Sequence, residues 1–193
     1  MRNLMAAVLG AVALLLSGCQ DMRIEDFTGR TPALDPFRYF EGRTRAWGIF
    51  EDRFGRVRRE FTVDIHGRAD GADGFVLEED FAYADGERER RVWRLRRTGP
   101  GSYEGRADDV VGVATGRAAG NALNWRYALA LRIGGSRWNV DFNDWMFLQP
   151  DGVLLNRARM SKWGLELGQV TLAFQRVSAH AAVAAAGYAD AAQ

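Results

Sequence analysis

The chain is poor in the residues from which most catalytic and metal centres are built. Its 193 residues include one cysteine and two histidines, too few for a zinc cluster, a disulfide framework or Cys/His catalysis. With four prolines and 11% aromatic residues, it resembles neither a proline-rich linker nor a disordered chain. The 26 basic residues nearly balance the 25 acidic ones, so no nucleic-acid-binding surface is expected. The composition fits one globular domain.

The first 19 residues are interpreted as a targeting signal and not as part of the fold. Arg2 precedes an apolar run over residues 4–16, which is too short to span a bilayer comfortably and fits a signal-peptide core. The run ends in Leu16-Ser17-Gly18-Cys19, which resembles the lipobox of bacterial lipoproteins. That resemblance implies a signal peptide over residues 1–18, cleavage before Cys19 and acylation of its thiol. The alternative is an ordinary secretory signal with an incidental cysteine.

Lipidation of Cys19 would make the protein a periplasm-facing lipoprotein. The mature chain, residues 19–193, has no second cysteine, so it can form no internal disulfide. Each buried methylene adds about 0.8 kcal/mol of membrane affinity, so two or three acyl chains give a stable anchor. Gln20 replaces the aspartate associated with inner-membrane retention in enteric bacteria, which favours the outer membrane. The expected partner is therefore a membrane, with no cofactor and no nucleic acid.

The mature chain divides into a tether, a main domain and a tail. Residues 19–34 are mostly polar and are interpreted as the acylated N-terminus and a tether. Asp35 followed by Pro36 predicts the N-cap and first position of a short helical turn that runs through Phe40. The main domain covers residues 35–178. Residues 179–193 are rich in alanine and are expected to be a frayed helix or disordered.

The hydrophobic pattern between residues 42 and 175 has a period of two. Runs rich in valine and aromatic residues recur every 10 to 15 residues between glycine-containing turns. This spacing predicts an all-β antiparallel meander of about 8–10 strands, closed into a barrel. The turn lengths set the expected cross-strand pairs. These are Leu131–Trp138, Leu129–Val140, Tyr127–Phe142, Trp125–Asp144, Leu123–Met146, Leu77–Trp93, Phe75–Leu95, Glu79–Arg91, Met146–Asn156, Asp144–Ala158, Trp47–Phe61 and Arg45–Val63.

Six short blocks of the chain carry a family resemblance. They are residues 40–48 (FEGRTRAWG), 90–93 (RRVW), 107–112 (ADDVVG), 120–123 (GNAL), 144–146 (DWM) and 156–158 (NRA). The set resembles domain-of-unknown-function family 3833, an uncharacterised proteobacterial lipoprotein family. The resemblance implies a calycin-like, lipocalin-type β-barrel and no particular activity. The Gly-x-Trp of the first lipocalin strand is here Gly42-Arg43-Thr44, so the likeness to lipocalins is one of fold.

Two carboxylates fall on the apolar face of the predicted strands, Glu79 and Asp144. A buried, unpaired carboxylate is costly, so each must be protonated, paired or reached by water. They could anchor a ligand or act as a general acid/base pair. The structural alternative pairs Glu79 with Arg91 and satisfies Asp144 through Trp125, Asn156 or an arginine.

Other features of the chain allow more than one interpretation. Asp108-Asp109 could bind calcium, or it could cap a turn. The glycines around Gly105 and Gly116 lack the order of a phosphate-binding loop and are more typical of bulges, barrel corners or a backbone opened to a ligand.

We expect a non-enzymatic binding module whose barrel holds a fatty acid, a phospholipid or another apolar envelope molecule. One alternative is a structural or interaction lipoprotein whose barrel is filled by its own aromatic side chains; another is a lipid-acting enzyme using Asp144 or Glu79. An open apolar cavity of about 300 Å3 or more would favour binding. No catalytic residue or metal ligand is predicted. The predicted ligand-binding residues are Arg45, Glu79, Arg91, Trp93, Trp125, Tyr127, Asp144 and Asn156.

Overall fold

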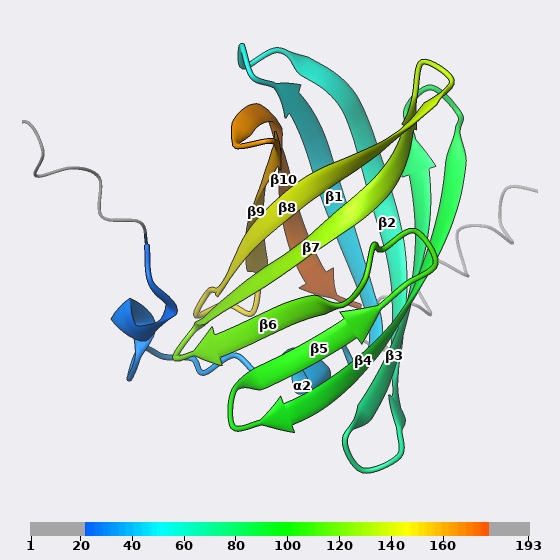
Figure 1. The fold of residues 1–193 in the computed structure, drawn as a ribbon. Helices are drawn as coiled ribbons and strands as arrows, with labels where there is room; N and C mark the ends of the chain where they lie inside the picture. The colour runs from blue at the N-terminus through cyan, green and yellow to red at the C-terminus, as the bar shows by residue number, and fades with distance from the viewer. Residues whose placement is uncertain (1–21, 178–193) are drawn as a thin grey trace, which may run out of the picture.

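Ten antiparallel strands wind in sequence order around a closed barrel (Figure 1). The structure is a computed structural model and describes residues 22–177. Each strand pairs with the next along the chain, and β1 pairs with β10 to close the sheet, which confirms the predicted meander. The strands are β1 (Gly42–Asp52), β2 (Val57–Asp70), β3 (Gly74–Tyr83), β4 (Arg88–Gly99), β5 (Ser102–Arg106), β6 (Ala114–Ala119), β7 (Ala122–Ile133), β8 (Ser136–Leu148), β9 (Leu154–Lys162) and β10 (Leu165–Arg176).

A short helix covers one end of the barrel. The helix α2 (Pro36–Phe40) lies at the end where β2–β3 and β4–β5 turn (Figure 1). The Asp35 carboxylate accepts hydrogen bonds from the backbone N–H groups of Phe37 and Arg38, which confirms the predicted N-cap. The Phe37 ring stacks on Phe75 with centroids 4.9 Å apart, so the helix supplies an aromatic floor. Within residues 22–177, no helix covers the opposite end, where β1–β2, β3–β4, β7–β8 and β9–β10 turn; this is called the open end.

Residues 22–34 lie against the outer surface of the barrel. The 3₁₀ helix η1 (Ile24–Phe27) buries both of its apolar side chains, and the Phe27 ring lies 5.8 Å from that of Trp145. Leu34 N–H then donates to the Gly120 carbonyl at 2.8 Å. Residues 22–34 of the expected tether therefore pack on the barrel, whereas residues 19–21, the expected signal peptide over 1–18 and the tail over 179–193 lie outside the described residues. The docking site is formed by outward-facing apolar side chains, which the polar composition of the segment did not reveal.

Most of the predicted strand registers are confirmed. Around the turn after β7, Tyr127 lies opposite Phe142 and Trp125 opposite Asp144. The expected β3–β4 and β8–β9 pairs are also present. These hairpins have tight turns and a strict alternation of apolar and polar residues, which together fix the register.

The β1–β2 register was predicted one residue out of place. Glu51 pairs with Val57 next to the expected turn, but the register shifts between Phe50 and Glu51. Such a bulge inserts one extra residue on one strand. Trp47 consequently lies opposite Thr62 rather than Phe61, and 46% of its surface is exposed. A slip of one residue exchanges the two faces of a strand. Trp47 and Arg45, which share one face of β1, therefore point to the outside of the barrel and not to its interior as predicted.

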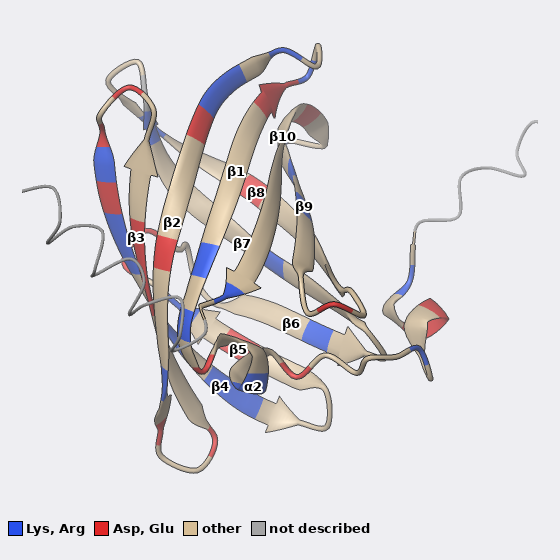
Figure 2. Cartoon of the chain, turned by 180° about the vertical axis from the view of Figure 1, so that it is seen from behind, with Lys and Arg blue, Asp and Glu red and all other residues tan. Residues whose placement is uncertain are grey.

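Many charged residues are distributed over the outside of the barrel. Figure 2 shows basic and acidic residues interspersed along β2, β3 and β4. Many form cross-strand ion pairs, such as Arg90 with Glu78 at 2.8 Å and Arg96 with Glu104 at 3.0 Å. Exposed pairs of this kind contribute about 0–1 kcal/mol each. None of the helices in residues 22–177 has the length and apolar character needed to cross a membrane.

Candidate functional site

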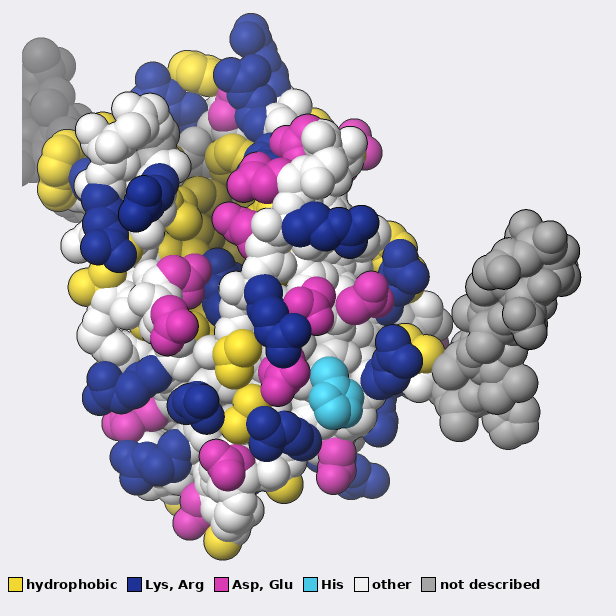
Figure 3. All heavy atoms as spheres, turned by 90° about the vertical axis from the view of Figure 1, so that its right-hand side faces the viewer, with side chains coloured by type: hydrophobic (Ala, Val, Ile, Leu, Met, Phe, Trp, Pro, Cys, Tyr) yellow, Lys and Arg dark blue, Asp and Glu magenta, His cyan; other side chains and the backbone are white. Residues whose placement is uncertain are grey.

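The barrel encloses a cavity of about 840 Å3. Pro36, Phe37 and Phe40 of the α2 segment form one end, and its wall is mostly aromatic and aliphatic. Figure 3 shows the molecule hollowed on one side, with hydrophobic side chains at depth and charged ones around the opening. The volume falls within the range of small-molecule sites. It exceeds the 300 Å3 expected for a binding module, so the structure disagrees with a barrel filled by its own side chains.

Seven of the eight predicted ligand-binding residues line this cavity. They are Glu79, Arg91, Trp93, Trp125, Tyr127, Asp144 and Asn156. Arg45 does not: its guanidinium lies 4.0 Å from the Asp64 carboxylate and 5.9 Å from the centre of the exposed Trp47 ring. The one-residue shift in the β1–β2 register explains this difference, because alternate residues of a strand face opposite sides.

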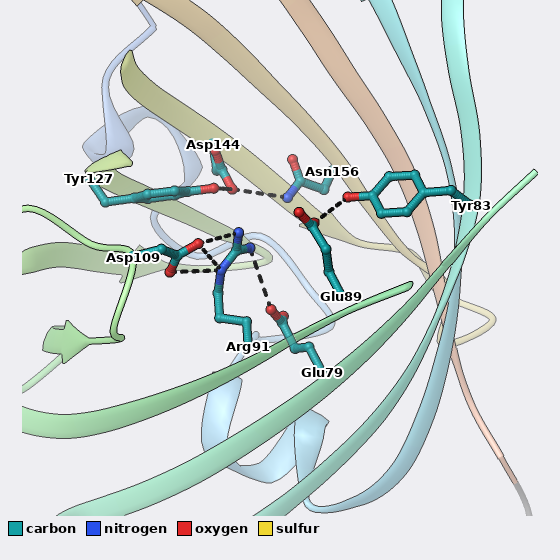
Figure 4. Close-up of polar contacts among 8 residues, drawn as sticks. All are labelled: Glu79, Tyr83, Glu89, Arg91, Asp109, Tyr127, Asp144 and Asn156. Carbon is teal, nitrogen blue, oxygen red and sulfur yellow. Dashed lines mark hydrogen bonds and ion pairs between the residues drawn. The ribbon is translucent and has the colours of Figure 1, made fainter. Parts of the chain in front are cut away.

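Arg91 is the centre of a three-residue ion network on the cavity wall (Figure 4). Its Nε and Nη2 atoms donate to the Asp109 carboxylate at 3.0 and 2.7 Å, while Nη1 lies 3.8 Å from Glu79 Oε2. Burial lowers the pKa of Arg91, but the charges of Glu79 and Asp109 outweigh it and raise the pKa overall. The guanidinium is therefore permanently charged and already neutralised by the protein.

Asp144 forms a second polar cluster, from β7, β8 and β9 (Figure 4). The Tyr127 hydroxyl donates to Asp144 Oδ2 at 3.3 Å, and Asn156 Nδ2 donates to the same oxygen at 3.4 Å. Burial raises the pKa of Asp144 to about 7, although both hydrogen bonds work in the opposite direction. The carboxyl group can thus gain or lose a proton near neutral pH.

The two clusters influence each other electrostatically. Burial raises the pKa of Glu79, and the charge of Arg91 and a hydrogen bond from Trp93 only partly offset that effect. The charge of Glu79 in turn raises the pKa of Asp144, whereas Arg91 lowers it. The structural alternative for Glu79, an ion pair with Arg91, is therefore present, but within the wall of a cavity rather than in a packed core.

Several polar residues that line the cavity were missed by the sequence analysis, among them Tyr83, Glu89 and Asp109. Tyr83 donates its hydroxyl proton to Glu89 at 2.7 Å (Figure 4), and both line the cavity. They could have been found, because Tyr83 shares the strand face of Glu79, and Glu89 shares that of Arg91. Asp109 carried no such signal, since it reaches Arg91 from the loop between β5 and β6.

Trp125 depends on two glycines that the sequence left ambiguous. A Cβ atom at Gly105 would lie 2.7 Å from the Trp125 ring, and one at Gly116 would overlap that ring. The glycines therefore make room for an indole on the inner face of the short strands β5 and β6. The Trp93 ring packs edge-on against it, with centroids 5.8 Å apart, which extends the aromatic wall of the cavity.

The family model for DUF3833, described as a protein of unknown function, matches residues 13–176. The chain belongs to the DUF3833 family. This confirms the resemblance carried by the six sequence blocks. No curated protein matches the chain of this DUF3833 protein.

The fold of this DUF3833 protein also has a counterpart among solved structures. It is similar to an S-type phycobiliprotein lyase, CPES, from Guillardia theta, with a TM-score of 0.56 and 10% sequence identity. The match covers 82% of this chain and 95% of that chain. At this identity the likeness concerns the fold, a calycin-like barrel.

The DUF3833 site combines a large apolar volume with a few polar groups. Such a cavity can bury an apolar molecule and orient it through hydrogen bonds. The Asp144 carboxyl can also exchange a proton near neutral pH. Within residues 22–177, no group of three or more His, Cys, Asp or Glu side chains is arranged to hold a metal ion.

Proposed function

We propose that this protein binds a lipid or another apolar molecule of the cell envelope inside its barrel. The observation that carries the proposal is the cavity of about 840 Å3, whose apolar wall contains a small number of polar groups. The proposed role is binding rather than catalysis.

We further propose that the mature protein is anchored through acylated Cys19 and faces the periplasm, with the outer membrane as the favoured site. The apolar run and Leu16-Ser17-Gly18-Cys19 support this. An acyl anchor would keep the barrel close to a source of apolar ligands.

The turns at the open end of the barrel suit contact with a lipid surface. Phe54 and Trp163 are 71% and 83% exposed, far more than aromatic side chains in a core. The rings of Trp138 and Trp163 lie 6.4 Å apart, and the Lys162 ammonium sits within 4.7 Å of both ring centres. Aromatic rings next to a cation favour the interface of an anionic bilayer.

The binding proposal is tested by looking for a co-purified ligand. The mature chain with Cys19→Ser would be produced in a bacterial periplasm, purified, and studied by native and denaturing mass spectrometry after solvent extraction. We expect a stoichiometric lipid. Leu172→Trp should displace it, because Leu172 lines the cavity. Thr171→Trp is the matched control, because Thr171 is exposed on the other face of the same strand.

Two results would contradict the proposal. One is a protein that is empty after purification and also fails to take up the neutral dye Nile red. The other is a bound lipid that Leu172→Trp leaves in place, since that lipid would lie outside the barrel.

The anchor is tested separately on the full chain. Mass spectrometry of the N-terminal peptide should show cleavage before Cys19 and acylation of this residue. Cys19→Ser should move the protein from the membrane to the soluble fraction, and membrane fractionation identifies which membrane holds it. An intact or unacylated N-terminus would contradict the proposed anchor.

A further inference from the structure

Two hydrogen-bond acceptors inside the cavity have no partner. Asp144 Oδ1 and Asn156 Oδ1 are both buried without a hydrogen bond, and their residues are 5% and 4% exposed. Both residues line the cavity from the neighbouring strands β8 and β9. Leaving a buried polar atom unsatisfied costs about 1–3 kcal/mol. A ligand that donates hydrogen bonds at this point would remove that cost.

Two of the three arginines that line the cavity, Arg91 and Arg59, are already engaged by carboxylates of the protein. Arg91 is held bidentately by Asp109 and faces Glu79 on its other side. Arg59 pairs with Asp85 at 3.0 Å and also with Glu87. Neither guanidinium is free to receive an anionic head group without giving up a carboxylate.

Carboxylates also outnumber cations around the cavity. Five acidic residues line it, against three arginines. They are Glu79, Glu87, Glu89, Asp109 and Asp144, against Arg59, Arg91 and Arg132. The charge of the lining therefore opposes the carboxylate of a fatty acid and favours a cation.

From these contacts, and resting on the proposed function, we propose that the ligand is an apolar molecule with a protonated amine head. The ammonium group would sit between Asp144 Oδ1 and Asn156 Oδ1 and donate a hydrogen bond to each. An ammonium carries three donors and no acceptor, which matches the two unpaired oxygens, both of them acceptors when Asp144 is ionised. The chain of the ligand would lie along the aromatic wall, which includes Trp93 and Trp125.

The Asp144 carboxyl is suited to this role. Its pKa of about 7 in the free protein means that it is easily neutral when the cavity holds no cation. An ammonium at hydrogen-bonding distance would stabilise the ionised form. Charge-assisted hydrogen bonds are about twice as strong as neutral ones, so the amine should be preferred over an uncharged donor.

Three probes of equal chain length separate the possible head groups. Decylamine, decanol and decanoic acid would be titrated at pH 8 against Nile red bound to the mature Cys19→Ser chain. We expect decylamine to bind about tenfold more tightly than decanol, and decanoic acid to bind most weakly. This ranking uses the unsubstituted cavity, so it does not depend on whether a variant folds.

A matched pair of variants then locates the amine. Asp144→Asn should weaken decylamine by about tenfold and leave decanol nearly unchanged. Asp141→Asn should have no effect, because Asp141 is exposed on the outer face of the same strand. Circular dichroism checks that both variants remain folded. Asn156→Leu removes the second acceptor and should also reduce the preference for the amine.

Several outcomes would overturn this inference. They are tighter binding of decanoic acid, equal binding of decylamine and decanol, or an equal loss of all three probes in Asp144→Asn. In each case Nile red would still bind, so the proposed function would survive. Failure of Nile red to enter the barrel, or its insensitivity to Leu172→Trp, would instead remove the proposed function itself.

Discussion

Replacing Asp144 with asparagine is expected to stabilise the empty protein at pH 8 but not at pH 4. Asparagine keeps the shape of the side chain and an acceptor for the Tyr127 hydroxyl, but it cannot ionise. The folded protein holds the Asp144 pKa at about 7, compared with 3.8 for an unperturbed aspartate. Between these values the folded state keeps a proton that the unfolded state has released.

The size and sign of the effect follow from that difference in pKa. Because the folded state binds more protons, the free energy of unfolding falls as the pH rises from about 4 to about 7. Each unit of pKa difference corresponds to about 1.4 kcal/mol, so the ionised Asp144 costs about 4 kcal/mol above pH 7. For a chain of this size, that corresponds to about 10 °C in Tm. Asp144→Asn removes the cost.

The assay is urea and thermal unfolding of the mature Cys19→Ser chain between pH 4 and pH 8. Comparing Asp144→Asn with the unsubstituted protein at each pH cancels most of the titration of other groups. Glu79, Arg91, Tyr127 and Asn156 all act on Asp144 and remain in both proteins. Asp141→Asn, on the outer face, controls for removing one acidic charge from β8.

Two results would refute this reasoning. If Asp144→Asn changes the stability equally at pH 4 and pH 8, the carboxyl does not titrate differently in the folded protein. If the variant is less stable at every pH, the lost interactions of Asp144 outweigh the cost of its charge. The expected result is a difference in the free energy of unfolding between Asp144→Asn and the unsubstituted protein that grows as the pH rises from 4 to 7.

Three further predictions concern the ion network, the cavity wall and the open end. Arg91→Met should lower the free energy of unfolding by about 3–5 kcal/mol at pH 8, measured by urea unfolding, because Glu79 is left without its counter-charge. The loss should be smaller at pH 5, where Glu79 protonates more easily because burial raises its pKa. Gly116→Ala should push the Trp125 ring into the cavity and weaken Nile red binding, at about 1–3 kcal/mol of stability. Trp163→Ala should leave stability within about 0.5 kcal/mol but reduce association with anionic vesicles in a flotation assay.

Each of these predictions has its own control. Adding Glu79→Gln to Arg91→Met should recover most of the lost stability, and no recovery would contradict the proposed pairing. Unchanged Nile red binding in Gly116→Ala would mean that the added Cβ does not push the Trp125 ring into the cavity, which would contradict this prediction. Trp47→Ala removes another exposed tryptophan, on the outside of β1. An equal loss of vesicle binding in this variant would argue against a specific role for the open end.

The cost of Asp144 bears on the function of the protein. An apolar side chain at this position would avoid both the buried charge and the unsatisfied Oδ1 atom. A group that lowers stability in the empty cavity but can be compensated by a ligand is typical of a functional site. The β7–β8 pairing continues without a register shift past Asp144, which lies opposite Trp125, so the strand pairing does not depend on the carboxyl.

The candidate site was predictable where strand alternation decides which way a side chain points. Asp144 and Tyr127 follow from the pairing around Gly134-Gly135, and Glu79 and Arg91 from the pairing around Gly86. In both hairpins a tight turn leaves the register no freedom. Arg45 was assigned to the wrong face because the β1–β2 register shifts by one residue at a bulge in β2, where Arg58 is the extra residue. The alternating pattern does not record such a choice of backbone geometry.

The amino-acid sequence by itself determined the class of the fold, its strand order and most of the residues of the cavity wall, because a period of two and short turns are local properties. Only the tertiary structure decided whether the barrel is filled or open. That depends on how ten strands curve and close, with β1 against β10, and on how α2 covers one end. It also brought Asp109 to Arg91 and left Asp144 Oδ1 without a partner. Such contacts depend on distances across the barrel, and the order of residues along the chain does not specify those distances.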